Sequence, residues 1–199
     1  MIIYAPFSTK TNIALRQPTL DFLSGYMENN KSDILISKDC TDSDYLYEQG
    51  FTGIIKQYPK DDIIIIEQDV VPTDSIMLNI KADNADVVEN AYQAISDKQF
   101  NERLLSQTEK NPLFADRLPK ENKSVIYAFG ICKINNKVLL SYLDDKNNGI
   151  LPDNISWIQF YDIFYAWYLG LAYNGKKFIK KNFTPISQLN NEVAIHNKA

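Results

Sequence analysis

The sequence has little cysteine, histidine and glycine, and each shortage narrows the possible chemistry. Its 199 residues include 2 cysteines, 1 histidine and 7 glycines. The two cysteines, Cys40 and Cys132, cannot form a disulfide framework and lack the clustered spacing of a zinc site. Neither the Gly-x-Gly-x-x-Gly fingerprint nor a Walker phosphate loop is present. We therefore expect any metal site to depend mainly on carboxylates.

The sequence also lacks a strong excess of charge of either sign. Lys and Arg together number 21 against 25 Asp and Glu, which gives a formal net charge of −4. Proteins that bind the phosphate backbone of nucleic acids broadly usually carry a basic field. We therefore expect no nucleic-acid partner.

No hydrophobic run is long enough to cross a bilayer. The most apolar stretch, Trp157–Tyr173, is interrupted by Gln159 and Asp162 and falls short of the roughly 18–20 residues required. The opening residues show neither a basic leader nor a small-residue cleavage site. We expect a cytoplasmic protein with no transmembrane segment.

Apolar residues are nevertheless plentiful, at 45% of the chain, which is enough for a sizeable core. We expect a single domain over residues 1–199, with one half over 1–95, a mobile connection over 100–123 and a second half over 124–199. In the first half, predicted strands alternate with helices. The expected elements are a strand over Met1–Phe7, a helix beginning near Pro18, a strand over Asp33–Ser37, a helix over Ser43–Gln49 and a strand over Ile63–Ile66. This alternation predicts an α/β fold with a mostly parallel, Rossmann-type sheet between two layers of helices.

The second half predicts a mixed or antiparallel arrangement. Asp86–Ile95 is expected to be helical, and Trp157–Tyr173, which contains eight aromatic residues, is expected to be a buried helix. Ser124–Ile134 and Lys137–Leu143 are expected to form a hairpin. A final strand is expected over Val193–Ile195.

Glu67 and Asp69 follow the buried strand Ile63–Ile66 directly. Ligands commonly bind beyond the carboxyl ends of parallel strands, and two neighbouring carboxylates repel each other unless a cation or proton separates them. Oxygen ligands of this kind suit Mg²⁺ or Mn²⁺ together with phosphate. His196, the one histidine, is a possible additional ligand. The alternative for Glu67 and Asp69 is that they are solvated acidic residues at the end of a strand. The alternative for His196 is that it is a tail residue without a function.

Asp162 lies within the aromatic helix, where a carboxylate is costly to bury unless it is paired or opens on a cavity. Partial desolvation would make it a better general base. The alternative is an Asp on the solvent face of the helix. Asp153 is a second candidate base, although its position suggests a helix cap.

Four segments together resemble the GT-A glycosyltransferases, especially family 2-like members. They are Met1–Ser8, the run Ile34-Leu-Ile-Ser-Lys-Asp-Cys-Thr-Asp42, the run Ile63-Ile-Ile-Ile-Glu-Gln-Asp-Val-Val-Pro72, and Trp157–Lys177. They resemble, in turn, the first strand with its nucleotide loop, the second strand, the D-x-D strand and the acceptor-side helix. The closing Val-Ala-Ile-His196 is similar to a metal-binding histidine of that family.

The resemblance implies an inverting transfer of a sugar from a nucleotide-diphosphate sugar to a hydroxyl acceptor, which could be a glycan, a lipid-linked molecule or a protein. It implies that Asp69 and His196 hold Mn²⁺ or Mg²⁺ and that Asp162 is the catalytic base. Nucleotide contacts would come from the loop Pro6, Phe7 and Ser8, from Asp39 and from Glu67.

The chain departs from the family pattern at two of these positions. Glu67 replaces the first Asp of the D-x-D motif, and Tyr161-Asp162 replaces the usual Glu-Asp pair. A catalytically degenerate GT-A-like binding domain therefore stays open as an alternative. A receiver-like domain, which the strand ending in Glu67 and Asp69 also resembles, and a nucleotidyltransferase are further alternatives.

Overall fold

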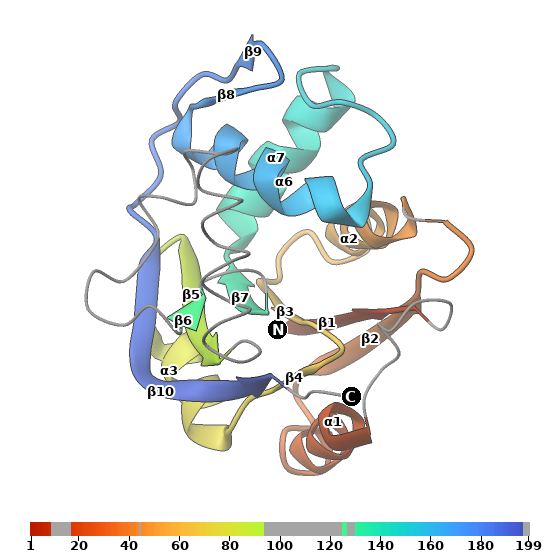
Figure 1. Ribbon diagram of the computed structural model, residues 1–199, viewed down its shortest axis with the longest axis vertical. Helices are drawn as coiled ribbons and strands as arrows, with labels where there is room; N and C mark the ends of the chain where they lie inside the picture. The colour runs from red at the N-terminus through yellow and green to blue at the C-terminus, as the bar shows by residue number, and fades with distance from the viewer. Residues whose placement is uncertain (9–16, 44, 94–124, 127–129, 197–199) are drawn as a thin grey trace.

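The protein is described by a computed structural model that covers residues 1–8, 17–43, 45–93, 125–126 and 130–196. Within those residues, eight strands form one sheet in the order β2-β1-β3-β7-β5-β10-β4, with β6 beside β5 (Figure 1). The strands are β1 (Ile2–Phe7), β2 (Ile34–Asp39), β3 (Ile63–Ile66), β4 (Val70–Val71), β5 (Val87–Gln93), β6 (Val125–Ile126), β7 (Ile131–Ile134) and β10 (Ser187–His196). The described helices are α1 (Gln17–Asn29), α2 (Leu46–Gln57), α3 (Asp74–Ala82), α6 (Asn136–Asn147) and α7 (Trp157–Leu169), and a separate hairpin joins β8 (Ala172–Tyr173) to β9 (Lys176–Lys177).

Most of the sheet runs in one direction. β1 is parallel to β2 and β3, and β5 is parallel to β10. Both β3 and β5 are antiparallel to β7, so β5 and β10 point the same way as β1, β2 and β3. Only β4, β6 and β7 run in the opposite direction within the described sheet. The expected α/β architecture with a mostly parallel sheet and a mixed second half is therefore confirmed.

Alternation along β3 shows how the sheet acquires two layers of helices. Ile63 and Ile65 pack with α2, α6 and α7, whereas Ile64 and Ile66 pack with α1 and α3. All four are at most 1% exposed, and burying each isoleucine side chain contributes about 1.5–3 kcal/mol. Figure 1 shows α2, α6 and α7 on one side of the sheet and α1 and α3 on the other. A strand that is apolar on both faces therefore lies at the centre of the fold.

Aromatic side chains from both halves of the chain fill the α2–α6–α7 layer. Phe51 of α2 packs against Tyr142 of α6 and Phe160 of α7, with ring centroids 5.8 and 5.0 Å away. Aromatic pairs of this kind contribute about 0.5–1.5 kcal/mol beyond the area that they bury. The expected connection over 100–123 lies outside the described residues.

Two predicted elements of the second half are wrong. Asp86–Ile95 was expected to be a helix but contains β5, whose buried Val87 and Val88 pair with β7. Lys137–Leu143 was expected to be a strand but belongs to α6. There the Oδ1 atom of Asn135 accepts a hydrogen bond from the Val138 N–H at 3.1 Å and caps the helix.

Two helices end at different places from those predicted, and a glycine is involved in each. The helix expected over Ser43–Gln49 continues as α2 through Gly50 to Gln57. A Cβ at Gly50 would lie 2.5 Å from the Tyr4 hydroxyl oxygen. The glycine thus permits close packing between α2 and β1. In α7 the end comes earlier than expected, at Leu169, because Gly170 adopts φ +69° and caps the helix.

Candidate functional site

The carboxyl ends of the same-direction strands meet along one edge of the sheet, here called the carboxyl edge. Phe7 ends β1 in register with Asp39 at the end of β2, and Glu67 follows β3 directly. His196 ends β10 and pairs with Val70, the residue after Asp69. Three chain segments that are distant in sequence therefore place Asp39, Glu67 with Asp69, and the His196 backbone at the same edge. This is the position at which parallel sheets commonly bind ligands.

A short turn places Asp69 beyond the end of β3. The Glu67 N–H donates to the Gly130 carbonyl at 2.9 Å, which extends the contact with the chain before β7. The Val70 N–H then donates to the Glu67 carbonyl at 3.1 Å, so the chain turns over residues 67–70. β4 follows immediately and pairs antiparallel with β10. The local hydrogen bonds thus explain why Asp69 and the last residue of β10 lie near each other.

Glu67 has a strongly altered proton affinity. Burial, followed by the negative charge of Asp69, raises the pKa of Glu67 from its ordinary value of 4.5 to about 8. At neutral pH the folded protein therefore holds this carboxyl largely protonated. A divalent cation between the two carboxyl groups would reverse the effect by favouring the ionised forms.

Tyr47 places a buried hydroxyl group near Glu67. Its side chain comes from the first turn of α2 and is 4% exposed. Among the described residues, its hydroxyl has no hydrogen-bond partner. Burial, followed by the charge of Glu67, raises the pKa of Tyr47 well above its usual range. An unsatisfied buried hydroxyl costs about 1–3 kcal/mol, which is acceptable where a bound group supplies the missing contact.

The predicted nucleotide loop lies at the end of β1. Pro6 is buried, and Phe7 and Ser8 are half-buried. The Cys40 N–H donates to the Phe7 carbonyl at 2.7 Å and ties the end of β2 to this loop. Asp39 is exposed, and its Oδ1 atom accepts a hydrogen bond from the Thr41 N–H at 2.8 Å. The structure therefore brings the predicted loop and Asp39 to neighbouring strand ends.

The predicted metal ligands come together at the level of the backbone. The register of β4 and β10 places the His196 backbone opposite Val70, and the side chain of His196 is not among those described. Among the described side chains, no group of three or more His, Cys, Asp or Glu residues is arranged to hold a metal. The assignment of Asp69 and His196 to a metal remains a prediction.

Asp162, the predicted base, lies half-buried on α7, in the helix layer above the sheet. Its negative charge, after the larger effect of burial, raises the pKa of Tyr173 on β8. Two residues earlier on α7, the Phe160 ring centroid lies 5.4 Å from that of the Tyr47 ring. The start of α7 therefore contacts the residue that neighbours Glu67, while Asp162 faces the hairpin of β8 and β9. Its role as a base remains a prediction.

Asp153 is exposed in the loop before α7 and does not cap that helix. Ser156 is the N-cap instead, and its hydroxyl donates to the Gln159 Oε1 atom at 3.0 Å. The sequence reasoning did not identify Tyr47 as a residue near the candidate site. The apolar spacing of Tyr47, Phe51 and Ile54 indicates a buried helix face, but nothing in it points to Glu67.

No family model matches this chain, and no curated protein matches it. Among solved structures, the crystal structure of A197 from STIV is similar to it over 70% of this chain, with 16% sequence identity and a TM-score of 0.42. The chain covers 66% of A197, just under two thirds of its length. A similarity of this size assigns neither a family nor a function. Within the described residues, no helix combines the length and apolar character needed to span a bilayer.

Proposed function

We propose that this protein is a divalent-metal-dependent glycosyltransferase that moves a sugar from a nucleotide-diphosphate sugar to a hydroxyl acceptor. The observation that carries the proposal is the convergence of Asp39, Glu67, Asp69 and the His196 backbone at the carboxyl edge. The resemblance to GT-A glycosyltransferases, which rests on short sequence motifs, supports the same assignment.

The chemistry of the edge suits a cation and a diphosphate. Asp69 would hold Mn²⁺ or Mg²⁺ together with His196, since carboxylate and imidazole are both good ligands for Mn²⁺. Bound there, the ion would stabilise the negative charge that develops on the diphosphate as the sugar–phosphate bond breaks. The raised pKa of Glu67 and the unsatisfied hydroxyl of Tyr47 support the presence of a bound group at this place.

The remaining residues would position the two substrates. Pro6, Phe7 and Ser8 would contact the nucleotide, with Asp39 near the nucleoside and Glu67 near the ribose or the metal. Asp162 would take the proton of the acceptor hydroxyl while that oxygen attacks the sugar from the face opposite the diphosphate. This arrangement gives inversion at the sugar carbon.

A binding domain without catalytic activity is the second candidate. Two features favour it: the pKa of Glu67 is raised by burial and by Asp69, and Asp162 lies close enough to Tyr173 of β8 to raise the pKa of that tyrosine. The receiver-like alternative is less compatible with the sheet. Flavodoxin-like domains have the all-parallel order 2-1-3-4-5, whereas here the other neighbour of β3 is the antiparallel β7.

The test is the release of nucleotide diphosphate from a panel of UDP- and GDP-sugars incubated with the protein and Mn²⁺. The proposal predicts metal-dependent hydrolysis or transfer that is lost in Asp69→Ala. The control is Asp61→Ala, because Asp61 lies at the opposite end of β3 and pairs with the N-terminal amine at 3.3 Å. Metal-dependent binding without turnover would favour the binding domain, and neither binding nor turnover would reject both candidates.

A further inference from the structure

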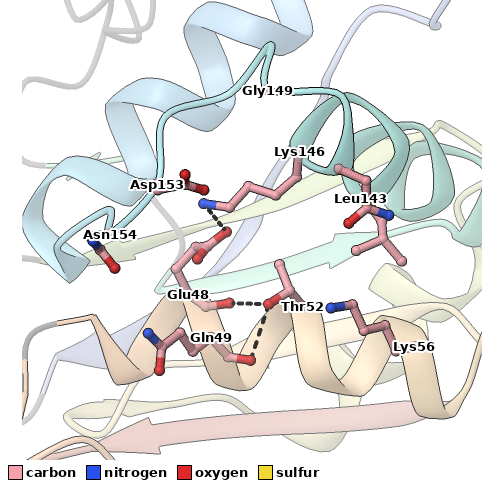
Figure 2. Close-up of a pocket in the computed structure, with 10 residues that line it drawn as sticks. Glu48, Gln49, Thr52, Lys56, Leu143, Lys146, Gly149, Asp153 and Asn154 are labelled. Atoms are coloured by element: carbon pink, nitrogen blue, oxygen red, sulfur yellow. Dashed lines mark hydrogen bonds and ion pairs between the residues drawn. The ribbon is translucent and has the colours of Figure 1, made fainter.

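Two cavities share the loop that precedes α7, and both include Asp153 and Asn154 in their walls. The first, between α2 and α6, has a volume of about 600 Å³ and is drawn in Figure 2. The charged side chains at its centre already have partners within the protein. Glu48 is ion-paired with Lys146 at 3.1 Å, as Figure 2 shows, and also accepts a hydrogen bond from Tyr142 at 3.3 Å. These contacts indicate a mainly structural role for the buried charges of the first cavity.

The second cavity, here called the α7–β8 pocket, has a different composition. It has a volume of about 370 Å³ and lies between α7, the hairpin of β8 and β9, and the loop before α7. Three buried apolar side chains, Ile155, Ile163 and Phe178, contribute to its wall. This size falls within the range of pockets that bind small molecules, about 300–1,000 Å³.

Polar side chains and one accessible aromatic ring complete the α7–β8 pocket. Asp153, Asn154, Gln159 and Asn174 are exposed residues of its wall, and each offers carboxylate or amide groups. The Tyr173 ring is half-buried and also contributes to this wall. The pocket therefore combines a partly accessible ring with several groups that both donate and accept hydrogen bonds.

The two asparagines of this wall have an unusual backbone. Among the described residues, Asn154 and Asn174 are the non-glycine residues with positive φ, at 52° and 47°. Asparagine tolerates this region better than most residues, and such positions occur often at binding sites. They lie on separate segments, one before α7 and one between β8 and β9, and both belong to the wall of the same pocket. The wall is thus built from two tight turns that present amide side chains.

We infer that the α7–β8 pocket binds a saccharide. A sugar ring has an apolar C–H face that packs on an aromatic ring, and its hydroxyl groups pair with carboxylate and amide side chains. The pocket offers both features, with Tyr173 as the ring and Asp153, Asn154 and Gln159 as the polar partners. Its two charged wall residues, Asp153 and Lys176, have opposite signs, so the pocket favours a neutral ligand over an ionic one.

This inference does not depend on glycosyl transfer, because a saccharide site requires neither nucleotide nor metal. If both hold, the saccharide lies beside the predicted base. Asp162 affects Tyr173 electrostatically, and its helix neighbours Gln159 and Ile163 belong to the wall of the pocket. The pocket would then hold the hydroxyl acceptor.

The test is ligand-observed saturation-transfer NMR with the methyl glycosides of glucose, galactose, mannose and N-acetylglucosamine, in the absence of nucleotide and metal. We expect at least one glycoside to bind with a Kd of about 1 mM. Tyr173→Ala should weaken that binding at least ~10-fold, since it removes the stacking ring. Asp153→Asn should weaken it by a smaller factor, and because Asp153 is exposed this variant should fold normally.

The matched controls are Tyr58→Ala, at the end of α2, and Asp144→Asn, on the exposed side of α6. Neither residue contributes to the wall of the α7–β8 pocket, and both variants should bind as the unaltered protein does. The inference is overturned if none of the four glycosides binds. It is equally overturned if binding is unchanged in both Tyr173→Ala and Asp153→Asn. If the protein binds a glycoside but transfers no sugar, the proposed function is wrong and the saccharide site is retained.

Discussion

The carboxyl groups at the two edges of the sheet have opposite electrostatic surroundings. At the amino edge, Asp33 accepts a hydrogen bond from Tyr26 at 3.0 Å and is ion-paired with Lys81 at 2.5 Å. Asp86, on the same edge, accepts hydrogen bonds from the Thr184 N–H at 2.8 Å and from Asn135 at 2.6 Å. At the carboxyl edge, Glu67 is instead half-buried close to the negative charge of Asp69.

The pKa values of Asp86 and Glu67 reflect this difference. Burial alone would raise the pKa of Asp86, but hydrogen bonds from Thr184, Asn135 and Lys137 hold it below its ordinary value of 3.8. For Glu67 both burial and Asp69 raise the pKa, to about 8. A carboxylate that receives hydrogen bonds or an ion pair stabilises the fold. A carboxylate without such partners lowers stability, and such groups are common at sites where a ligand binds. The comparison therefore favours a structural role for the carboxylates of the amino edge and supports the proposed binding role of the carboxyl edge.

The largest expected effect is the loss of metal-linked nucleotide binding at the carboxyl edge. Asp69→Ala should weaken Mn²⁺-dependent binding of a nucleotide diphosphate by at least ~100-fold, because it removes a direct ligand of the ion. Calorimetric titration with UDP and GDP, with and without Mn²⁺, measures the change. Undiminished Mn²⁺-dependent binding in this variant would remove Asp69 from the site.

The next effect concerns the base on α7. Asp162→Asn should fold and bind the sugar nucleotide normally but transfer sugar at least ~100-fold more slowly, because the amide cannot accept the proton. Asp144→Asn is the matched comparison, since it removes an exposed carboxylate from α6 that does not contribute to the wall of the α7–β8 pocket. Thermal unfolding, donor affinity and transfer rate should be measured on one preparation. A stable Asp162→Asn variant with an unchanged transfer rate would exclude Asp162 as the base.

At the amino edge we expect an effect on stability alone. Asp86→Ala should lower the free energy of unfolding by about 3 kcal/mol at pH 7, because it leaves Thr184 and Asn135 without their acceptor. Asp86 has a lowered pKa in the folded state, so its contribution is present above pH 3.8 and is lost as the pH falls below that value. Urea unfolding at pH 7 and at pH 3 measures both effects. A difference that stays constant between these two pH values would contradict the electrostatic explanation.

The last effect has the opposite sign. In the unfolded chain Glu67 ionises near pH 4.5, whereas in the folded protein it keeps its proton up to about pH 8. The free energy of unfolding therefore falls as the pH rises from 4.5 to 8. Without divalent cations, Glu67→Gln should melt about 10 °C higher than the unaltered protein at pH 8, and at the same temperature as the unaltered protein at pH 4. If Glu67→Gln and the unaltered protein melt at the same temperature at both pH 4 and pH 8, the pKa of Glu67 is not raised in the folded protein.

The first half of the fold was largely predictable from sequence because its signals are local. Ile63–Ile66 is apolar on both faces, and such a run is typical of a central parallel strand. Pro18 in the first turn of α1 is likewise a local signal. Parallel strands place their carboxyl ends together, so a site that includes Glu67 and Asp69 followed from the predicted order of elements. Asp39 was added to that site by the resemblance to GT-A glycosyltransferases.

The second half was predicted less well because long-range contacts decide its structure. β5 is a strand since Val87 and Val88 are buried between β7 and β10, a context that local sequence does not contain. For α6 a local signal existed in the helical spacing of Val138, Leu139 and Tyr142, but the paired asparagines indicated a turn. The proximity of Tyr47 to Glu67 likewise depends on how α2 packs on the sheet.

The most direct test of the central claim is the proton count that accompanies cation binding at the carboxyl edge. At pH 7, calorimetric titration with UDP and Mn²⁺ in two buffers of different ionisation enthalpy gives the number of protons released. Because Glu67 holds its proton up to about pH 8, a cation beside it should expel about one proton from the unaltered protein and about none from Glu67→Gln. Mn²⁺-dependent binding that releases no proton, or releases the same number from both proteins, would contradict the account.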